Sequence, residues 1–321
     1  MISLILTVLN EKEHLPDWLA DIKSQTLSPD EIIVVDGGSI DGTWELLKGK
    51  SKDSKLRIYQ QPGNIAVGRN FAIRQALGDI IVATDAGCIY DPDWLKDLAS
   101  PLAAGKNQFA ATAFGPWLKK NDKMLVYLLA AATIPASQEF KKDWLPSSRS
   151  VAFTKELWQN VGGYPEWIPI CEDVIFDLKI KKMEIAPEYI RQPLVFWRPR
   201  RSLRSYFRQL FSYTRSDGHG KLWIKRQVVR YATYLIALII LFFSWKLYWP
   251  LFFSILFGSF IYLWKFWRRW LVFTEKKSLG FRLAGIFFLP IIILFGDLAK
   301  MAGWPAGVYE RWRGLIKFEK Y

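Results

Sequence analysis

Two stretches near the N-terminus decide the fold: ISLILTV at residues 2–8 and EIIVVDGGSIDGT at residues 31–43. Each begins with a continuous run of apolar, mostly β-branched residues, which is typical of a strand buried on both faces of a sheet. Between them, residues 15–22 carry apolar side chains three and four positions apart, which predicts an amphipathic helix. A strand, a helix and a second buried strand predict a βαβ unit with parallel strands.

The same alternation continues along the first part of the chain. Residues 56–60 and 79–84 are predicted as further strands, and residues 64–78 as a helix that ends at a glycine. We therefore expect residues 1–197 to form an α/β domain with a mainly parallel sheet.

Charge divides the chain into two parts. Residues 1–197 carry 22 basic and 25 acidic residues, whereas residues 198–321 carry 22 basic and 5 acidic ones. The basic part also holds the long apolar runs, a combination typical of the cytoplasmic flanks of membrane proteins and unnecessary for a nucleic-acid-binding protein. Two cysteines and two histidines exclude a disulfide scaffold and the common zinc patterns. The opening MISLILTVLNEKE has no basic n-region and no cleavage site, so no signal peptide is expected.

The segment 198–230 contains ten basic residues and one acid. We expect a helix in the membrane interface here, with one apolar face formed by Leu203, Phe207, Leu210 and Phe211. The alternative is a solvated basic helix that packs on the α/β domain.

Residues 231–321 are expected to form a membrane domain with spans at about 231–245, 247–264 and 283–299. The basic segment 265–278 indicates a cytoplasmic location for this part of the chain. The basic tail after the third span conflicts with this rule, so a re-entrant or interfacial third segment remains an alternative.

Polar residues gather where three predicted strands end. They are Thr7, Asn10 and Glu11 at the first strand, Asp36 at the second, and Asp85 after residues 79–84. The carboxyl ends of parallel strands meet at one edge of a sheet, where ligands bind in such folds. Because carboxylates are not buried without a donor or a ligand, this edge indicates a polar binding site. The glycines after Asp36 fit a plain strand-to-helix turn equally well.

Four blocks, in this order, resemble family 2 glycosyltransferases of the GT-A fold. They are TVLNEKEHLPDWLADIKSQTLSPDEIIVVDGGSIDGT, GNIAVGRNFAIRQALGDIIVATDAGCIYDPDWL, GGYPEWIPICEDVIFDLKIKK and FRQLFSYTRSDG. The resemblance covers about residues 1–220. It implies a Rossmann-like GT-A catalytic domain, here followed by the interface helix and transmembrane helices.

The resemblance also implies roles for individual residues. Nucleoside binding would fall to Thr7, Asn10, Glu11 and Asp36, phosphate or ribose contacts to Arg69, and contacts to the ribose and a metal-bound diphosphate to Asp85. Asp173 would be the general base of an inverting displacement, and Glu172 would orient it or bind the acceptor. An acceptor phosphate would already be anionic, and Asp173 would then position groups instead.

One departure from the family pattern concerns the metal. The Asp-x-Asp position reads Asp85-Ala86-Gly87, so the second acid is absent. Mg²⁺ or Mn²⁺ is still expected as cofactor, with Asp85 and His219 as candidate ligands, although His219 also fits an ordinary loop histidine. Arg215 and Arg208 are candidates for contacts to the diphosphate or the acceptor.

The expected function is that of a membrane-bound inverting glycosyltransferase of hexosyltransferase type in polysaccharide or glycolipid biosynthesis. It would move sugar from a UDP- or GDP-sugar to a lipid or lipid-linked acceptor, with its catalytic domain on the cytoplasmic face of the inner membrane and anionic lipids as partners. One alternative is a nucleotidyltransferase, which the lack of a glycine-rich, Lys-containing loop in TVLNEKE disfavours. The other is a non-catalytic nucleotide-sugar-binding scaffold. The absent second acid is compatible with it, whereas the Glu172–Asp173 pair counts against it.

Overall fold

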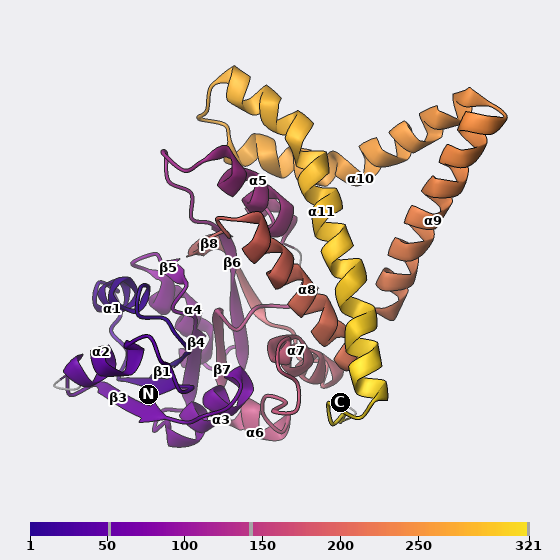
Figure 1. The fold of residues 1–321 in the computed structure, drawn as a ribbon. Coiled ribbons are helices and arrows are strands. Elements are labelled where there is room, and N and C mark those ends of the chain that lie inside the picture. Colours follow the sequence, from indigo (N-terminus) through magenta and orange to yellow (C-terminus); the bar gives the residue numbers. More distant parts are fainter. Residues whose placement is uncertain (51–52, 141–143, 320–321) are drawn as a thin grey trace. The chain divides into compact units, whose positions relative to one another are not determined.

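A computed structural model describes residues 1–50, 53–140 and 144–319 and divides the chain into two compact units. The first unit contains residues 1–117, 135–198 and Glu319, and the second contains residues 118–134 and 199–318 (Figure 1).

The first unit is built on a sheet with the strand order β3-β2-β1-β4-β7-β6-β8-β5. The parallel half consists of β1 (Ile2–Val8), β2 (Glu31–Asp36), β3 (Leu56–Gln60) and β4 (Ile80–Thr84). The other half is mixed and contains β5 (Cys88–Tyr90), β6 (Phe109–Pro116), β7 (Ser150–Thr154) and β8 (Glu188–Trp197). The predicted parallel strands are thus confirmed for β1 to β4, whereas β7 runs antiparallel to β4.

Helices cover both faces of this sheet because β1 is apolar on both faces. Leu4 and Leu6 pack in one core, together with Trp18, and Ile5 packs in the other. The first core lies under α1 (Leu15–Lys23), α2 (Thr43–Lys50) and α4 (Trp94–Ala103), and the second under α3 (Ile65–Gln75), α6 (Lys155–Asn160) and α7 (Glu172–Lys182). A short 3₁₀ turn also lies at Ser137–Glu139.

The strand register places the polar residues together. Val8 pairs with Asp36 on β2, and Leu6 pairs with Thr84 on β4. The carboxyl ends of β1, β2 and β4 therefore meet at one edge, as the sequence predicts.

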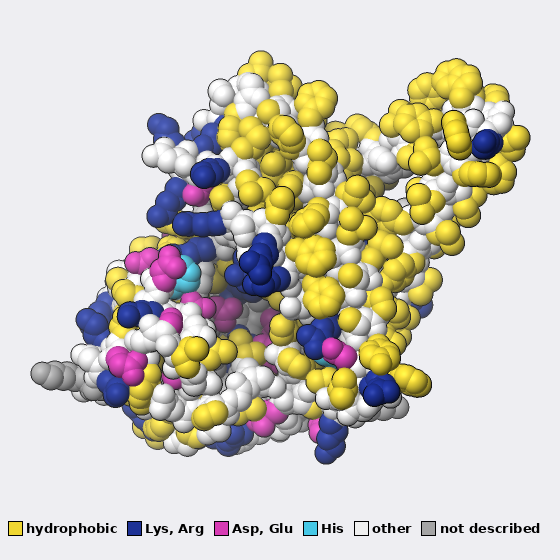
Figure 2. Space-filling view, viewed as in Figure 1, with side chains coloured by type: hydrophobic (Ala, Val, Ile, Leu, Met, Phe, Trp, Pro, Cys, Tyr) yellow, Lys and Arg dark blue, Asp and Glu magenta, His cyan; other side chains and the backbone are white. Residues whose placement is uncertain are grey.

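The second unit is helical. It contains α5 (Met124–Thr133), α8 (Leu203–His219), α9 (Ile224–Lys246), α10 (Phe252–Phe273) and α11 (Leu279–Trp312). A 3₁₀ turn at Trp249–Leu251 precedes α10. The three candidate spans are Ile224–Lys246, Trp249–Phe273 and Leu279–Trp312, and each ends beyond the C-terminal end of the apolar run seen in the sequence. Hydrophobic side chains cover the outside of these helices (Figure 2), with Leu235, Leu238 and Phe257 all at least 60% exposed. Such surfaces indicate association with a membrane.

The basic helix α8 packs closely along α11 within this unit. An added Cβ at Gly303 would lie 2.4 Å from the carbonyl oxygen of Phe211, so the two backbones meet where the side chain is missing. Of the apolar face expected from the sequence, Leu210 is buried and Leu203 is exposed.

A buried carboxylate joins the three long helices. Asp297 on α11 is fully buried and accepts hydrogen bonds from the hydroxyls of Tyr234 on α9, at 3.0 Å, and Tyr262 on α10, at 2.5 Å. The Lys300 ammonium lies 3.0 Å from it and the Arg230 guanidinium 3.7 Å. Ionisable groups in an apolar helix pair with one another, and this cluster connects α9, α10 and α11.

Replacing Asp297 by alanine should destabilise the second unit. The change leaves Lys300 and Arg230 without their shared counter-charge, and removing one partner of a buried ion pair costs about 3–5 kcal/mol. We expect a lower melting temperature for the full chain in detergent micelles, measured by circular dichroism. Glu275→Ala, at an exposed acid of the same unit, is the control and should melt as the wild type does. Equal melting of Asp297→Ala and wild type would contradict the prediction.

Candidate active site

Arg69 on α3 lies at the centre of the candidate site. Its side chain is only 3% exposed and donates through Nη1 to Oε1 of Glu172. Through Nη2 it donates to Oδ1 of Asp85 at 3.0 Å. The guanidinium also lies 5.4 Å from the ring centre of Tyr164. One buried cation thus joins the acid that follows β4 to the first turn of α7.

The backbone around Arg69 explains why it reaches this place. The side chain of Asn64 caps α3 by accepting from the amide of Val67 at 3.1 Å. Gly68 then lets the helix approach β1, because a Cβ there would lie 2.9 Å from Cγ2 of Thr7. The Gly-Arg pair therefore brings its arginine beside the sheet edge.

Burial and neighbouring charges shift the pKa values of this cluster. Burial disfavours the charged form of Arg69, but the nearby carboxylates of Glu172 and Asp85 outweigh this effect and hold the pKa of Arg69 above its ordinary value. Burial raises the pKa of Glu172, with Arg69 opposing the rise and Asp173 adding to it. The pKa of Asp177, one turn further along α7, is raised by burial and by Asp173.

Asp173 is the more accessible acid of the α7 pair. It is half-buried, accepts from the amide of Val174 at 2.9 Å, and lies 3.4 Å from the hydroxyl of Ser147. The helix starts after Cys171, whose φ of 68° is unusual for a residue other than glycine. This turn sets the direction in which both acids leave the backbone.

At the end of β2, Asp36 is fully buried and its carboxylate is occupied by its own loop. It accepts from the amide of Ser39 at 3.1 Å and from the hydroxyl of the same residue. Gln60 on β3 donates to it at 3.2 Å. Asp36 thus holds the shape of the glycine-rich turn.

The loop after β1 is bonded to that turn. Oδ1 of Asn10 accepts from the amide of Ile40 at 2.9 Å, and the amide of Glu11 donates to the hydroxyl of Thr43 at 2.9 Å. The hydroxyl of Thr7 is buried and has no hydrogen-bond partner among the described residues. The two loops form one preorganised edge that carries a buried, unsatisfied hydroxyl.

Arg149, which was not among the residues expected from the sequence, contacts Asp85 from the other side. Its Nε lies 3.6 Å from Oδ2 of Asp85, and its side chain is 16% exposed. No motif marks it in the sequence, because it precedes β7, and the antiparallel pairing of β7 with β4 brings it to the site. The only available signal is an arginine immediately before a buried apolar run.

The described residues do not fit the metal site expected from the resemblance. Asp85 is shared by two guanidinium groups, and Gly87 supplies no side chain. Within residues 1–50, 53–140 and 144–319, no three His, Cys, Asp or Glu side chains are grouped as metal ligands would be. Hard divalent cations prefer several oxygen ligands, so one shared carboxylate is a poor site for them.

The candidate residues of α8 are held within the second unit. Arg215 donates to both carboxylate oxygens of Glu310 on α11, at 2.7 and 2.6 Å. Nε2 of His219 lies 2.7 Å from the same carboxylate, and the histidine is 2% exposed. Arg208 is exposed on α8. The arrangement makes Glu310 the common partner of Arg215 and His219.

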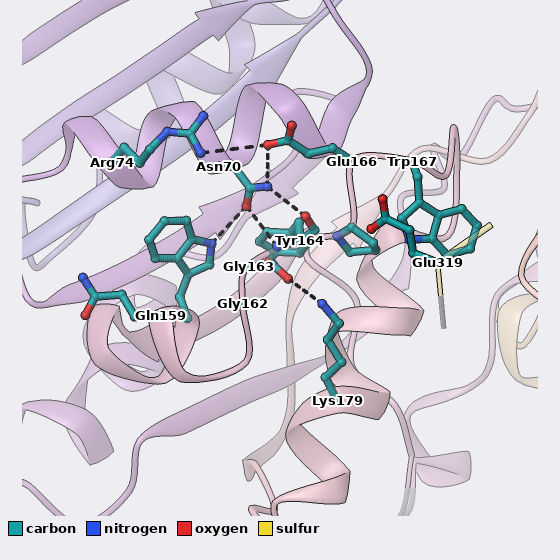
Figure 3. Close-up of a pocket in the computed structure, with 12 residues that line it drawn as sticks. Asn70, Arg74, Gln159, Gly162, Gly163, Tyr164, Glu166, Trp167, Lys179 and Glu319 are labelled. Atoms are coloured by element: carbon teal, nitrogen blue, oxygen red, sulfur yellow. Dashed lines mark hydrogen bonds and ion pairs between the residues drawn. The ribbon is translucent and has the colours of Figure 1, made fainter. Parts of the chain in front are cut away.

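A cavity of about 600 Å³ opens in the first unit beside the loop between α6 and α7 (Figure 3). Asn70 supports it with four hydrogen bonds from one amide. Its Nδ2 donates to the carbonyl of Tyr164 and to the carboxylate of Glu166, both at 2.8 Å, and its Oδ1 accepts from Tyr164 and Trp158. Since Asn70 follows Arg69, α3 contacts both the cavity and the acid cluster.

The comparisons with known proteins agree on the family. Residues 3–146 match the model described as Glycosyl transferase family 2. The O-antigen chain rhamnosyltransferase RfbN of Salmonella typhimurium is 25% identical over 64% of this chain and 70% of its own length. The dolichol-phosphate mannosyltransferase of Pyrococcus furiosus is 25% identical over 58% of this chain and 55% of its own length. The chain is a glycosyltransferase with a family 2 domain.

A solved structure supports the GT-A fold. The mannosyltransferase PcManGT of Pyrobaculum calidifontis, in complex with GDP-Man and Mn²⁺, has a TM-score of 0.54 and 18% identity over 97% of this chain and 86% of its own. The GT-A fold expected from the sequence is therefore confirmed.

Exchanging Asn70 for aspartate should destabilise the first unit. The change keeps the size of the side chain but turns two donated bonds into contacts between a carboxylate and the oxygens of Tyr164 and Glu166. Each lost buried bond costs about 1–3 kcal/mol. We expect a lower urea midpoint for the full chain in detergent, followed by tryptophan fluorescence. Gln159→Glu, an exposed amide that lines the same cavity, should have no such effect. An unchanged midpoint for Asn70→Asp would show that the network is dispensable.

Proposed function

We propose that this chain transfers a sugar, with inversion, from a nucleotide-sugar to a lipid or lipid-linked acceptor at the cytoplasmic face of a membrane. The observation that carries the proposal is the Arg69 ion pair, which joins Asp85 to Glu172, the neighbour of Asp173. This arrangement links the strand end where a nucleotide would bind to an acid that can receive a proton.

The donor would bind along the edge formed by the loops after β1 and β2. Thr7 offers its unsatisfied hydroxyl, and Asn10 and Glu11 lie on a loop that is already fixed to the glycine-rich turn. Asp36, which is buried and bonded within its own loop, would hold the shape of the turn that carries this edge. The relative with GDP-Man bound supports a nucleotide-sugar donor, and we propose a UDP- or GDP-sugar.

In the transfer step, the acceptor oxygen attacks the anomeric carbon while the bond from that carbon to the diphosphate oxygen breaks. Asp173 takes the proton of an acceptor hydroxyl, and the nucleoside diphosphate leaves with the bonding electrons. Glu172, held by Arg69, fixes the turn from which Asp173 projects. An acceptor phosphate brings no proton that must be removed, and Asp173 then positions it.

A membrane acceptor is supported by two features. The P. furiosus relative is named for dolichol phosphate, a lipid-linked acceptor. The second unit has three helices long and apolar enough to cross a bilayer, and the basic segments beside them favour the cytoplasmic side and anionic lipids. Arg208, which is exposed on α8, is the candidate for contacts to an acceptor phosphate, whereas Arg215 is held by Glu310.

Asp173→Asn is the test of the proposed base. With a hydroxyl acceptor, the variant should release nucleoside diphosphate about 100-fold more slowly or worse, since a general base contributes that much, while it binds the donor as the wild type does. The assay follows nucleoside diphosphate release by the full chain in detergent across a panel of nucleotide-sugars, with and without polyprenyl phosphate or lipid-linked glycans. Asp97→Asn, another half-buried acid in the first turn of a helix, is the matched control.

Two outcomes would contradict this function. Wild-type protein that binds no donor would exclude a nucleotide-sugar enzyme. Full turnover of a hydroxyl acceptor by Asp173→Asn would exclude Asp173 as the base.

A further inference from the structure

The carboxylate of Asp85 lies between two arginines. Oδ1 accepts from Arg69 at 3.0 Å, and Oδ2 lies 3.6 Å from Nε of Arg149. Asp85 is thus paired with both guanidinium groups, and Arg69 is also paired with Glu172. Each oxygen of Asp85 already faces a positively charged group.

Arg149 is held in a built position. The hydroxyl of Tyr90 lies within hydrogen-bond distance of the backbone carbonyls of Asp85 and Arg149, at 3.0 and 3.1 Å, and accepts from the amide of Asp85 at 3.0 Å. The guanidinium lies 4.2 Å from the ring centre of Trp197 and 5.7 Å from that of Phe114. Two rings and a buried tyrosine thus fix both the backbone and the charged end of Arg149.

Packing does not require a glycine at position 87, two residues after Asp85. A Cβ added to Gly87 would meet no atom within 4 Å, so there is space for a side chain where the second acid would stand. The chain nevertheless has no carboxylate there, and an arginine occupies the free side of Asp85.

We propose that Arg149 binds the diphosphate of the donor in place of a divalent cation, so that nucleotide binding and transfer need no metal. The inference rests on the proposed function. A guanidinium is always charged and presents paired donors that match two phosphate oxygens. It would stabilise the negative charge that develops on the leaving diphosphate, which is the contribution that a metal makes in other sites.

The test measures nucleotide binding by calorimetry with the full chain in detergent. UDP and GDP are titrated in excess EDTA and again in MnCl₂, with UMP and GMP as probes that lack the second phosphate. We expect the wild type to bind one of the diphosphates with the same affinity in both conditions.

Arg149→Gln should weaken binding of that diphosphate about tenfold or more, as expected when a charge-assisted hydrogen bond is lost, and should change monophosphate binding little. Arg149→Lys, which keeps the charge without the planar fork, should fall between the two. Arg57→Gln is the matched control, because Arg57 also pairs with an acid, at 2.6 Å, and lies 5.7 Å from a tyrosine ring, on β3.

Four results would overturn the inference. Loss of wild-type diphosphate binding in EDTA, with recovery in MnCl₂, would show a metal site. Equal diphosphate binding by Arg149→Gln and wild type, or an equal loss of mono- and diphosphate binding, would remove the assigned role from Arg149. If the wild type bound no nucleotide in either condition, the proposed function itself would fail and the inference with it.

Discussion

The buried guanidinium of Arg69 is the interaction on which the rest of the candidate site depends. A cation that is only 3% exposed is stable only beside compensating charge, and Asp85 and Glu172 supply that charge from two distant parts of the chain. Without the arginine, two carboxylates would face each other in a poorly solvated space. The same ion pairs fix the end of β4 relative to the first turn of α7, and thereby the direction of Asp173. The ion pairs that compensate the charge of Arg69 are therefore the same ones that fix the geometry of the candidate site.

The sequence predicted those parts of the site that depend on local pattern. The strands β1 to β4 are continuous apolar runs, and parallel strands must bring Asp36 and Asp85 to one edge. Arg149 could not be predicted in this way, because its place depends on β7 pairing antiparallel to β4, and no short-range pattern in the chain specifies that pairing. The hydrogen bonds that Asp36 accepts within its own loop could not be predicted either, since they depend on the exact conformation of the glycine-rich turn.

The second unit illustrates the same division between local and long-range information. Hydropathy located the three apolar segments, the third of them at about residues 283–299. The structure shows that Asp297 lies inside α11 and is bonded to Tyr234 and Tyr262 on two other helices. Neither tyrosine could be singled out from the sequence, because a single tyrosine within an apolar helix forms no recognisable pattern with its sequence neighbours. Only the packing of three helices shows that these side chains satisfy one another.

The charges of the candidate site are separated along its length. Asp173 and Glu172 lie at α7, where an acceptor hydroxyl would need a base, and Arg149 adds positive charge at Asp85, where a diphosphate would leave. A divalent cation at Asp85 would meet two guanidinium groups and a single carboxylate, so like-charge repulsion opposes its binding. A diphosphate would meet the same groups as donors and counter-charges. Under the proposed role of Arg149, these guanidinium groups would complement the anionic leaving group itself, and the missing second acid would be consistent with an intact Glu172–Asp173 pair.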